Sequence, residues 1–239
     1  MKNSMMESVL QADKVLIGIG TDFDEKFNSI RDESFVQLEK EDALEAGYRK
    51  LDFLQKNQRQ DCLDAYEKLF QLVKDKDYFV VTLCKDDLIY KTSFDESKVV
   101  APCGNFRFLQ CSKNCSNELL PITESMIVNK EKITCPHCGS PACFNQIGAE
   151  NYNENGYLPQ WDVYGKWLQK TINRKLCILE LGVGMQYPTV IRWAFEKVLT
   201  YNEKATMYRV HDTLYQYPIE LAQKGVSIQQ NPIEFINAI

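Results

Sequence analysis

Four of the nine cysteines form two closely spaced pairs. Three residues separate Cys111 from Cys115, two residues separate Cys135 from Cys138, and nineteen residues lie between the pairs. Each short pair can present two thiolates on one side of a turn, and the spacer can bring the four sulfurs to the corners of a tetrahedron. The spacing predicts a zinc site with Cys111, Cys115, Cys135 and Cys138 as ligands.

Four thiolates fill the coordination shell of zinc, so the predicted metal is structural and not catalytic. Few apolar residues lie between Cys111 and Cys143. We therefore expect metal ligation to stabilise this stretch in place of a hydrophobic core. His137 and Cys143 are alternative ligands, and four free or buried thiols in an ordinary loop are the remaining alternative.

Two pairs of glycines follow apolar runs that are typical of buried strands. The first pair is Gly18 and Gly20, and the second is Gly182 and Gly184. Glycine lets backbone amides approach a phosphate closely, so both pairs are candidates for nucleotide binding. The first pair lacks the third glycine of a dinucleotide fingerprint, and a tight strand exit is the alternative interpretation. Two such exits in one sheet favour a ligand site beyond the carboxyl ends of the strands.

The elements that carry these loops alternate between strands and helices. Apolar and β-branched runs predict strands over residues 15–20, 78–83, 98–101, 176–181, 206–210 and 226–228. Apolar residues at three- and four-residue steps predict a helix ending near residue 73, preceded by one or two more from about residue 35. Further helices are predicted over 162–172, 189–199 and 232–239.

This alternation predicts an α/β fold, in which a doubly wound parallel Rossmann-like sheet carries a smaller helical and zinc-ribbon module. We expect residues 1–107 and 146–239 to form the sheet domain, with a helical segment over about 31–75. Residues 108–145 are expected to form the zinc-ribbon insertion.

The composition excludes several classes of protein. With 44% hydrophobic and 26% charged residues, the chain is expected to fold as a globular protein. The net charge of -5 provides no broad basic surface for a nucleic acid. No apolar run reaches the ~20 residues needed to span a bilayer, and the first twenty residues lack the features of a signal peptide. We expect a cytoplasmic protein with reduced thiols and with neither a nucleic-acid nor a membrane partner.

The order of these features resembles that of the sirtuin family. The resemblance covers nearly the whole chain, and the segments 108–115 and 179–185 look most like the bacterial macrodomain-linked sirtuins. For that group the resemblance implies protein ADP-ribosyl transfer more than deacylation. It also implies an NAD-binding sheet, a zinc ribbon, and a cleft between them that holds NAD and a protein acceptor.

The resemblance implies a set of cofactor-binding residues near the ends of the strands. These are Gly18, Gly20, Asp22, Phe23, Thr82, Cys84, Gly182, Val183, Gly184 and His211. We expect the adenosine end of the ligand to lie against the second glycine pair and the pyrophosphate to lie near the first. His211 falls where the family places residues near the adenine ribose.

The sequence departs from the family at the nicotinamide end. The family motif Thr-Gln-Asn-Ile-Asp-Gly corresponds to residues 82–87, so Cys84 stands at the position of the Asn, while Asp86 is kept. Cys103 stands at the position of the histidine base. An ordinary thiol with a pKa near ~8.5 is mostly protonated at neutral pH, so Cys103 is a poor general base. Cys103 and Asp86 are the candidate catalytic residues.

The sequence therefore favours an NAD-dependent protein ADP-ribosyltransferase of the sirtuin type, with NAD and zinc as cofactors. One alternative is a catalytically degenerate sensor or scaffold that binds NAD or ADP-ribose. The others are a residual NAD-dependent deacylase and a zinc-ribbon interaction protein. The acidic residues near the first glycine pair, such as Asp22 and Asp24, can stabilise a developing cation but would repel a pyrophosphate beside them.

Overall fold

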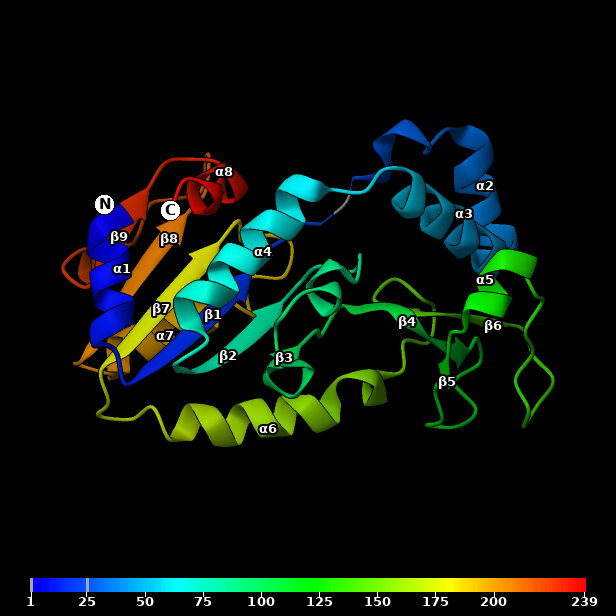
Figure 1. The fold of residues 1–239 in the computed structure, drawn as a ribbon. Coiled ribbons are helices and arrows are strands. Elements are labelled where there is room, and N and C mark those ends of the chain that lie inside the picture. The colour runs from blue at the N-terminus through cyan, green and yellow to red at the C-terminus, as the bar shows by residue number, and fades with distance from the viewer. Residues whose placement is uncertain (1, 25) are drawn as a thin grey trace.

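Two β-sheets organise residues 2–24 and 26–239, which are the residues described by the computed structural model (Figure 1). The larger sheet has six parallel strands in the order β3-β2-β1-β7-β8-β9. Its strands are β1 (Lys14–Ile19), β2 (Asp77–Thr82), β3 (Val99–Val100), β7 (Leu176–Leu181), β8 (Ala205–Val210) and β9 (Gly225–Ile228). Each strand lies within one residue of its predicted bounds, which confirms the predicted parallel sheet.

Helices cover both faces of the larger sheet, as the uninterrupted apolar character of its central strands requires. One face packs against α1 (Lys2–Gln11), α4 (Gln60–Val73) and α8 (Pro232–Asn237). The other face packs against α6 (Leu158–Gln169) and α7 (Arg192–Tyr201). Successive residues of β1 alternate between the two cores, with Val15 in the first and Leu16 in the second.

A smaller module lies beyond one end of the larger sheet (Figure 1). It contains an antiparallel sheet in the order β5-β4-β6. Its elements are α2 (Glu33–Glu41), α3 (Ala43–Lys56), β4 (Gly104–Cys111), β5 (Leu120–Pro121), α5 (Glu124–Asn129) and β6 (Ala142–Gln146). Leu44 and Tyr48 of α3 share a core with Phe106 and Phe144 of the sheet. We call this unit the small module.

The predicted helical segment over about 31–75 is thus divided between two cores. Helices α2 and α3 are separated by a single residue, Asp42, whose carboxylate accepts a hydrogen bond from the Glu45 amide at 3.0 Å and begins α3. Helix α3 packs in the small module, whereas α4 packs on the larger sheet. The exact boundaries between the domains stay a prediction.

Short 3-10 turns complete the fold. They are η1 (Phe27–Ser29), η2 (Leu88–Lys91), η3 (Glu96–Lys98), η4 (Glu154–Gly156) and η5 (Ile219–Leu221). None of the helices within residues 2–24 and 26–239 combines the length and the apolar character needed to cross a bilayer.

Candidate functional site

The two glycine pairs meet at the centre of the larger sheet. Strands β1 and β7 are neighbours, with Ile19 opposite Leu181, so the loops that follow them leave the same edge side by side. The chain runs outward from β1 to β3 and then returns to β7, which makes this edge a topological switch point. We call residues 20–24 the first loop and residues 182–187 the late loop.

Packing within the protein explains three of the four glycines. A Cβ atom on Gly18 would lie 2.5 Å from the side chain of Ile191, and one on Gly20 would lie 2.0 Å from the Gly182 carbonyl oxygen. Gly182 has a φ of +63°, and a Cβ atom there would lie 2.7 Å from the Asp22 side chain. A Cβ atom on Gly184 would meet no protein atom within 4 Å. Gly184 is therefore the glycine whose open side faces away from the protein.

The two loops differ in how their backbone amides are used. In the first loop, the Phe23 amide donates to Gly20 and the Asp24 amide donates to Thr21, both at 3.2 Å. The Asp22 amide donates to the Gly182 carbonyl at 3.4 Å. In the late loop, the amides at positions 183–187 find no acceptor within the described part of the chain. The Thr21 amide is the first-loop donor without an acceptor among the described residues, so most of the free donors for an anion are on the late loop. Cofactor roles for Gly18 and Gly20 stay a prediction.

Two of the predicted ligand-binding residues, His211 and Asp22, meet above Gly182. The Nδ1 atom of His211 accepts hydrogen bonds from the amides of Thr213 and Leu214, both at 3.1 Å. These contacts leave Nε2 as the protonated nitrogen of the neutral ring, and it lies 3.5 Å from Asp22 Oδ2. Burial lowers the pKa of His211, which favours this neutral form. The side chains of Asp22 and His211 thus join the ends of β1 and β8.

The cysteine at the position of the family's Asn is already bonded within the protein. The Cys84 thiol donates to the Gly20 carbonyl at 3.3 Å, and the Cys84 amide donates to Thr82 Oγ1 at 3.1 Å. The Tyr66 hydroxyl lies 3.8 Å from the Cys84 sulfur. Phe23 is fully buried, with its ring centroid 5.3 Å from that of Tyr66. The side chains of Phe23, Tyr66, Thr82 and Cys84 thus pack together into a buried, mainly apolar wall.

Asp86 combines deep burial with an unused oxygen. Its side chain is 2% exposed, and Oδ1 accepts a hydrogen bond from the Leu88 amide at 3.1 Å. Oδ2 has no hydrogen-bond partner among the described residues. Burial, reinforced by the nearby charge of Asp24, raises the pKa of Asp86 to about 8. The carboxyl group is therefore mostly protonated at neutral pH and can donate a hydrogen bond.

The adjacent residue, Asp87, stabilises the turn in which Asp86 lies. Its φ is +64°, and its Oδ1 accepts a hydrogen bond from the Phe106 amide at 3.1 Å, which links β2 to the small module. Burial raises the pKa of Asp87 to about 7.

Cys103 lies in the turn before β4 and is 1% exposed. Burial raises the pKa of its thiol to about 12, although the positive charge of Lys85 opposes the shift. The carbonyl of Cys103 accepts a hydrogen bond from the Ile147 amide at 2.8 Å. A thiol in this environment stays protonated at neutral pH, so Cys103 cannot act as a general base there.

The four predicted zinc ligands converge in the small module. Their sulfur atoms all lie within 4.8 Å of one another. Cys111 Sγ is 3.5 Å from Cys138 Sγ, and Cys115 Sγ is 3.4 Å from Cys135 Sγ. Tetrahedral zinc with Zn–S bonds of about 2.3 Å requires sulfurs about 3.8 Å apart, so the donor set fits the metal.

The two alternative ligands lie outside this cluster of sulfurs. His137 Nε2 contacts Glu118 Oε2 at 2.6 Å, and Cys143 is buried in β6.

Residues that the sequence analysis missed also border the site. A cavity of about 970 Å³ runs from Lys85 and Phe106 between α3 and β6 toward Ser112. Lys85 sits in the stretch that aligns with the family motif, but a lone lysine there gives no signal by residue type. Arg192 also reaches the site, because it donates a hydrogen bond to the Val183 carbonyl in the late loop. Only the folded chain brings it there.

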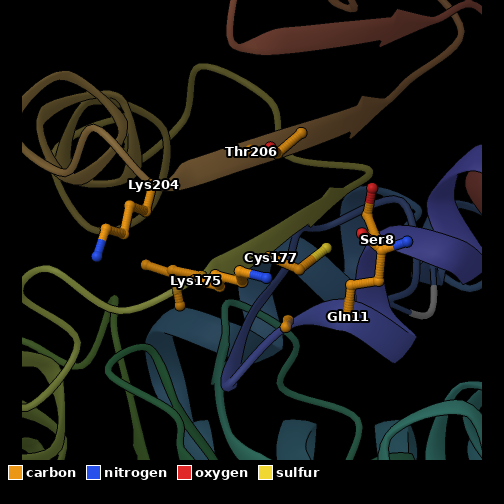
Figure 2. Close-up of a pocket in the computed structure, with 8 residues that line it drawn as sticks. Ser8, Gln11, Lys175, Cys177, Lys204 and Thr206 are labelled. Carbon is orange, nitrogen blue, oxygen red and sulfur yellow. The ribbon is translucent and has the colours of Figure 1, made fainter.

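A second cavity, of about 390 Å³, lies at the other end of the larger sheet (Figure 2). Lys175 and Cys177 line it at the amino end of β7, and Lys204 and Thr206 line it at the amino end of β8. Figure 2 shows the Lys204 side chain directed away from Ser8. Ligands of open α/β sheets bind beyond the carboxyl ends of strands, so this cavity is not the candidate site.

Comparison with solved structures identifies the fold. A Sir2 homologue in complex with NAD superposes with a TM-score of 0.62 at 12% identity, over 100% of this chain and 92% of the other. A mutant Sir2 homologue in complex with ADP-ribose gives 0.60 at 12% identity, over 100% and 94%. Sir2 bound to an acetylated peptide gives 0.62 at 13% identity, over 100% and 96%. The chain has the fold of the Sir2 sirtuins.

Two curated proteins are similar in sequence. A protein ADP-ribosyltransferase of Staphylococcus aureus is 22% identical over 180 residues, which cover 70% of this chain and 57% of the relative. A probable bifunctional ADP-ribose hydrolase/ADP-ribosyltransferase of Fusarium oxysporum f. sp. cubense is 27% identical over 141 residues, covering 52% and 24%. The matches thus span about half and about a quarter of these relatives. No protein-family profile matches the chain.

Proposed function

We propose that this chain binds NAD or ADP-ribose at the carboxyl edge of the larger sheet and transfers ADP-ribose from NAD to a protein. The observation that carries the proposal is the meeting of the first and late loops at the ends of β1 and β7. There Gly184 is open, and the late-loop amides have no acceptor among residues 2–24 and 26–239. The sirtuin fold and the similarity to two ADP-ribosyltransferases support the same chemistry.

The late loop is the proposed site of the phosphates and the adenosine. Amides that donate no bond within the protein can donate to phosphate oxygens, and a glycine beside them allows close approach. Asp22 limits where a pyrophosphate can lie, because its carboxylate would repel a phosphate placed above Gly182. A phosphate placed beside Gly184, where a Cβ atom would meet no protein atom within 4 Å, avoids this repulsion by Asp22. His211 and Asp22 supply polar atoms for a ribose on the same side.

Asp86 is the proposed contact for the nicotinamide group. A carboxamide presents one acceptor and two donors, and Asp86 Oδ2 lacks a partner within the described residues. In its protonated form Asp86 donates to the carboxamide oxygen, and in its ionised form it accepts from the amide nitrogen.

Cleavage of NAD releases nicotinamide with the electron pair of the glycosidic bond and leaves a positively charged ribose carbon, to which an acceptor nucleophile bonds. The protonated Cys103 thiol does not remove a proton from that acceptor. An acceptor that is already anionic at neutral pH, such as a carboxylate, needs no base. We therefore propose that transfer uses an acceptor of this kind, reached through the 970 Å³ cavity between α3 and β6.

We propose that zinc is bound by Cys111, Cys115, Cys135 and Cys138 and has a structural role. Four thiolates leave no open position for water, and the cluster belongs to the small module, whereas the first and late loops follow strands of the larger sheet. The metal would fix β4 and the segment before β6, which form one wall of the cavity.

A catalytically degenerate NAD or ADP-ribose binder is the second candidate. It is favoured by the burial of Cys103 and by the hydrogen bond that commits the Cys84 thiol to Gly20. Cys103 stands at the position of the family's histidine base and provides no base. Cys84 stands at the position of the family's Asn and provides no side-chain amide. A residual deacylase is disfavoured for the same reason, since that reaction needs the base that Cys103 does not supply.

Binding and turnover can be measured separately. We expect calorimetric titration to detect ADP-ribose binding at least as tight as NAD binding, because the family departures lie at the nicotinamide end. Nicotinamide release in the presence of candidate acceptor proteins then distinguishes the transferase from the degenerate binder. Absence of binding of either ligand at millimolar concentration would overturn both candidates.

Gly184→Val tests the late loop directly. The open space at Gly184 should let the variant fold, while its branched side chain blocks the ligand. We expect ADP-ribose affinity to fall at least tenfold, a loss of about 1.4 kcal/mol or more. Gly165→Ala is the matched control, since its Cβ also meets open space but lies on α6. Equal binding by Gly184→Val and the wild type would contradict the proposed site.

A further inference from the structure

Four charged side chains meet beneath the late loop, on the face of the sheet covered by α7. Glu180 is fully buried and lies opposite Arg209 in the register of β7 and β8. Arg209 Nε and Nη2 lie 2.6 Å and 3.0 Å from the two carboxylate oxygens of Glu180. Arg192 Nη2 lies 3.1 Å from Glu180 Oε1, and Arg209 Nη2 also contacts Glu196 Oε1 at 2.8 Å.

The arginines of this cluster also bind the backbone of two loops. Arg192 donates to the Val183 carbonyl in the late loop, and its Nη1 and Nη2 both donate to the Leu214 carbonyl at 3.0 Å. Arg209 donates to the Gln216 carbonyl at 2.7 Å. Leu214 and Gln216 follow β8, in the stretch that begins with His211. Arg192 is therefore a bridge between the late loop and the loop that carries His211.

The cluster is costly to bury and is not required for a well-packed core. Replacing a buried ion pair by apolar side chains of similar volume is often neutral or stabilising, so burial of these charges is weak evidence for a role in stability. The neighbouring positions on the same face, such as Ile178 and Met207, are apolar. Apolar side chains could not, however, donate the hydrogen bonds that Arg192 gives to the carbonyls of Val183 and Leu214.

The direction of those bonds matters for the late loop. A carbonyl held toward the Arg192 guanidinium turns the peptide so that the following amide points the other way. The late-loop amides have no acceptor of their own within the described residues, so the bond to the Val183 carbonyl is a main restraint on their orientation. Without it, the loop would have to be ordered at the expense of binding free energy.

We propose that Arg192 is a positioning residue for the adenosine and phosphate end of the site, which it organises by fixing the carbonyls of Val183 and Leu214. This inference rests on the proposed function, because it assumes that the late loop binds ADP-ribose. Glu180 and Arg209 hold the guanidinium in place, and Arg192 itself does not contact the ligand.

Arg192→Met is the test, since methionine preserves an unbranched apolar stem and leaves Glu180 paired with Arg209. We expect the dissociation constants of ADP-ribose and of AMP to rise in parallel, by at least about tenfold, as hydrogen bonds that order the loop are lost. Leu199→Ala is the control for a purely structural effect, because it loosens α7 at its other end. It should lower the melting temperature and leave both dissociation constants within about twofold.

Arg192→Lys provides a second, conservative variant that keeps a cation beside Glu180. Arg192→Lys should retain more affinity for ADP-ribose than Arg192→Met. It also provides a folded variant for the test if Arg192→Met does not fold. The backbone amide signals of Gly182 and Gly184 in a nitrogen-15 correlation spectrum report loop order without ligand. They should broaden or shift in the Arg192 variants and stay unchanged in Leu199→Ala.

The outcomes separate this inference from the proposed function. Wild-type protein that binds neither ADP-ribose nor AMP overturns the proposed function and the positioning role together. Wild-type binding with an unchanged dissociation constant in a folded Arg192 variant overturns the positioning role alone. Equal losses in the Arg192 variants and in Leu199→Ala would likewise assign Arg192 to general stability.

Discussion

Asp86 gives the site a measurable pH dependence. Its pKa is raised from 3.8 to about 8, chiefly by burial. The native state therefore holds a proton that the unfolded chain has released throughout the interval between these values. Because the unfolded state binds fewer protons, the free energy of unfolding falls as pH rises from about 4 to about 8. Above that interval the native state carries an ionised, partly unbonded carboxylate.

The magnitude follows from the size of the shift. The change from 3.8 to about 8 is about four pKa units, and each unit corresponds to about 1.4 kcal/mol. Asp86→Asn is a neutral isostere of the protonated acid, and its amide oxygen can still accept the bond from the Leu88 amide. We expect the variant to match the wild type near pH 4 and to exceed its unfolding free energy by on the order of 5 kcal/mol above pH 8.

Urea denaturation between pH 4 and 9 measures this difference, with Asp87→Asn as the control. Asparagine tolerates the left-handed backbone conformation of residue 87, and the pKa of Asp87 is raised to about 7. Relative to the wild type, Asp87→Asn should therefore gain less unfolding free energy than Asp86→Asn, and its gain should stop increasing at a lower pH. A gain of less than about 1 kcal/mol for Asp86→Asn at pH 8.5 would refute the assignment of a buried, protonated carboxyl group.

Two further changes test the metal and the missing base. Cys135→Ser should release one zinc per chain and expose the backbone amides of the small module to hydrogen exchange, while β1 and β7 stay protected, because ligation stabilises a module with a small core. Wild-type protein that is folded and free of metal would contradict the zinc site. Cys103→His alone should not produce deacetylation of an acetyl-lysine peptide, because the Cys84 thiol and the first loop still differ from the family pattern. Robust turnover by that variant would show that the base is the sole deficiency.

The sequence predicts the larger sheet well because its central strands β1, β2, β7 and β8 are largely buried on both faces. Such strands appear as continuous apolar runs, and two shorter runs correspond to the edge strands β3 and β9. The cluster of four cysteines is predicted equally well, since two closely spaced cysteine pairs are typical of metal ligation in a chain expected to keep its thiols reduced. In each case the signal is local to a few consecutive residues.

The small sheet and the first helix carry no such local signal. Strand β4 includes Asn105, Arg107 and Gln110, so its apolar pattern is interrupted, and its core partners come from α3. Helix α1 buries only Met5 and Val9, which is too few for a recognisable periodic stripe. Both elements form because tertiary packing supplies what their own sequences do not.

The glycines show why residue type alone does not identify a site. Gly18 and Gly184 look alike in the sequence, as each follows an apolar run. In the folded chain a side chain at Gly18 would collide with Ile191, whereas one at Gly184 would meet open space. Which glycine is required by packing and which is left for a ligand depends on α7, whose contact with β1 is set by the topology.

The two ends of the site also differ in what the protein leaves available. At the late loop the backbone donors are unbonded within the described residues, and the Arg192 cluster orients them from below. At the other end the Cys84 thiol is bonded to Gly20 and Cys103 is buried. Among the described residues, Asp86 Oδ2 and Gln146 Nε2 are buried side-chain atoms there without a hydrogen-bond partner. Affinity for the ADP-ribose portion can therefore persist while catalysis depends on the acceptor's own charge. Binding and turnover are thus governed by different groups, and each must be measured to define what the chain does.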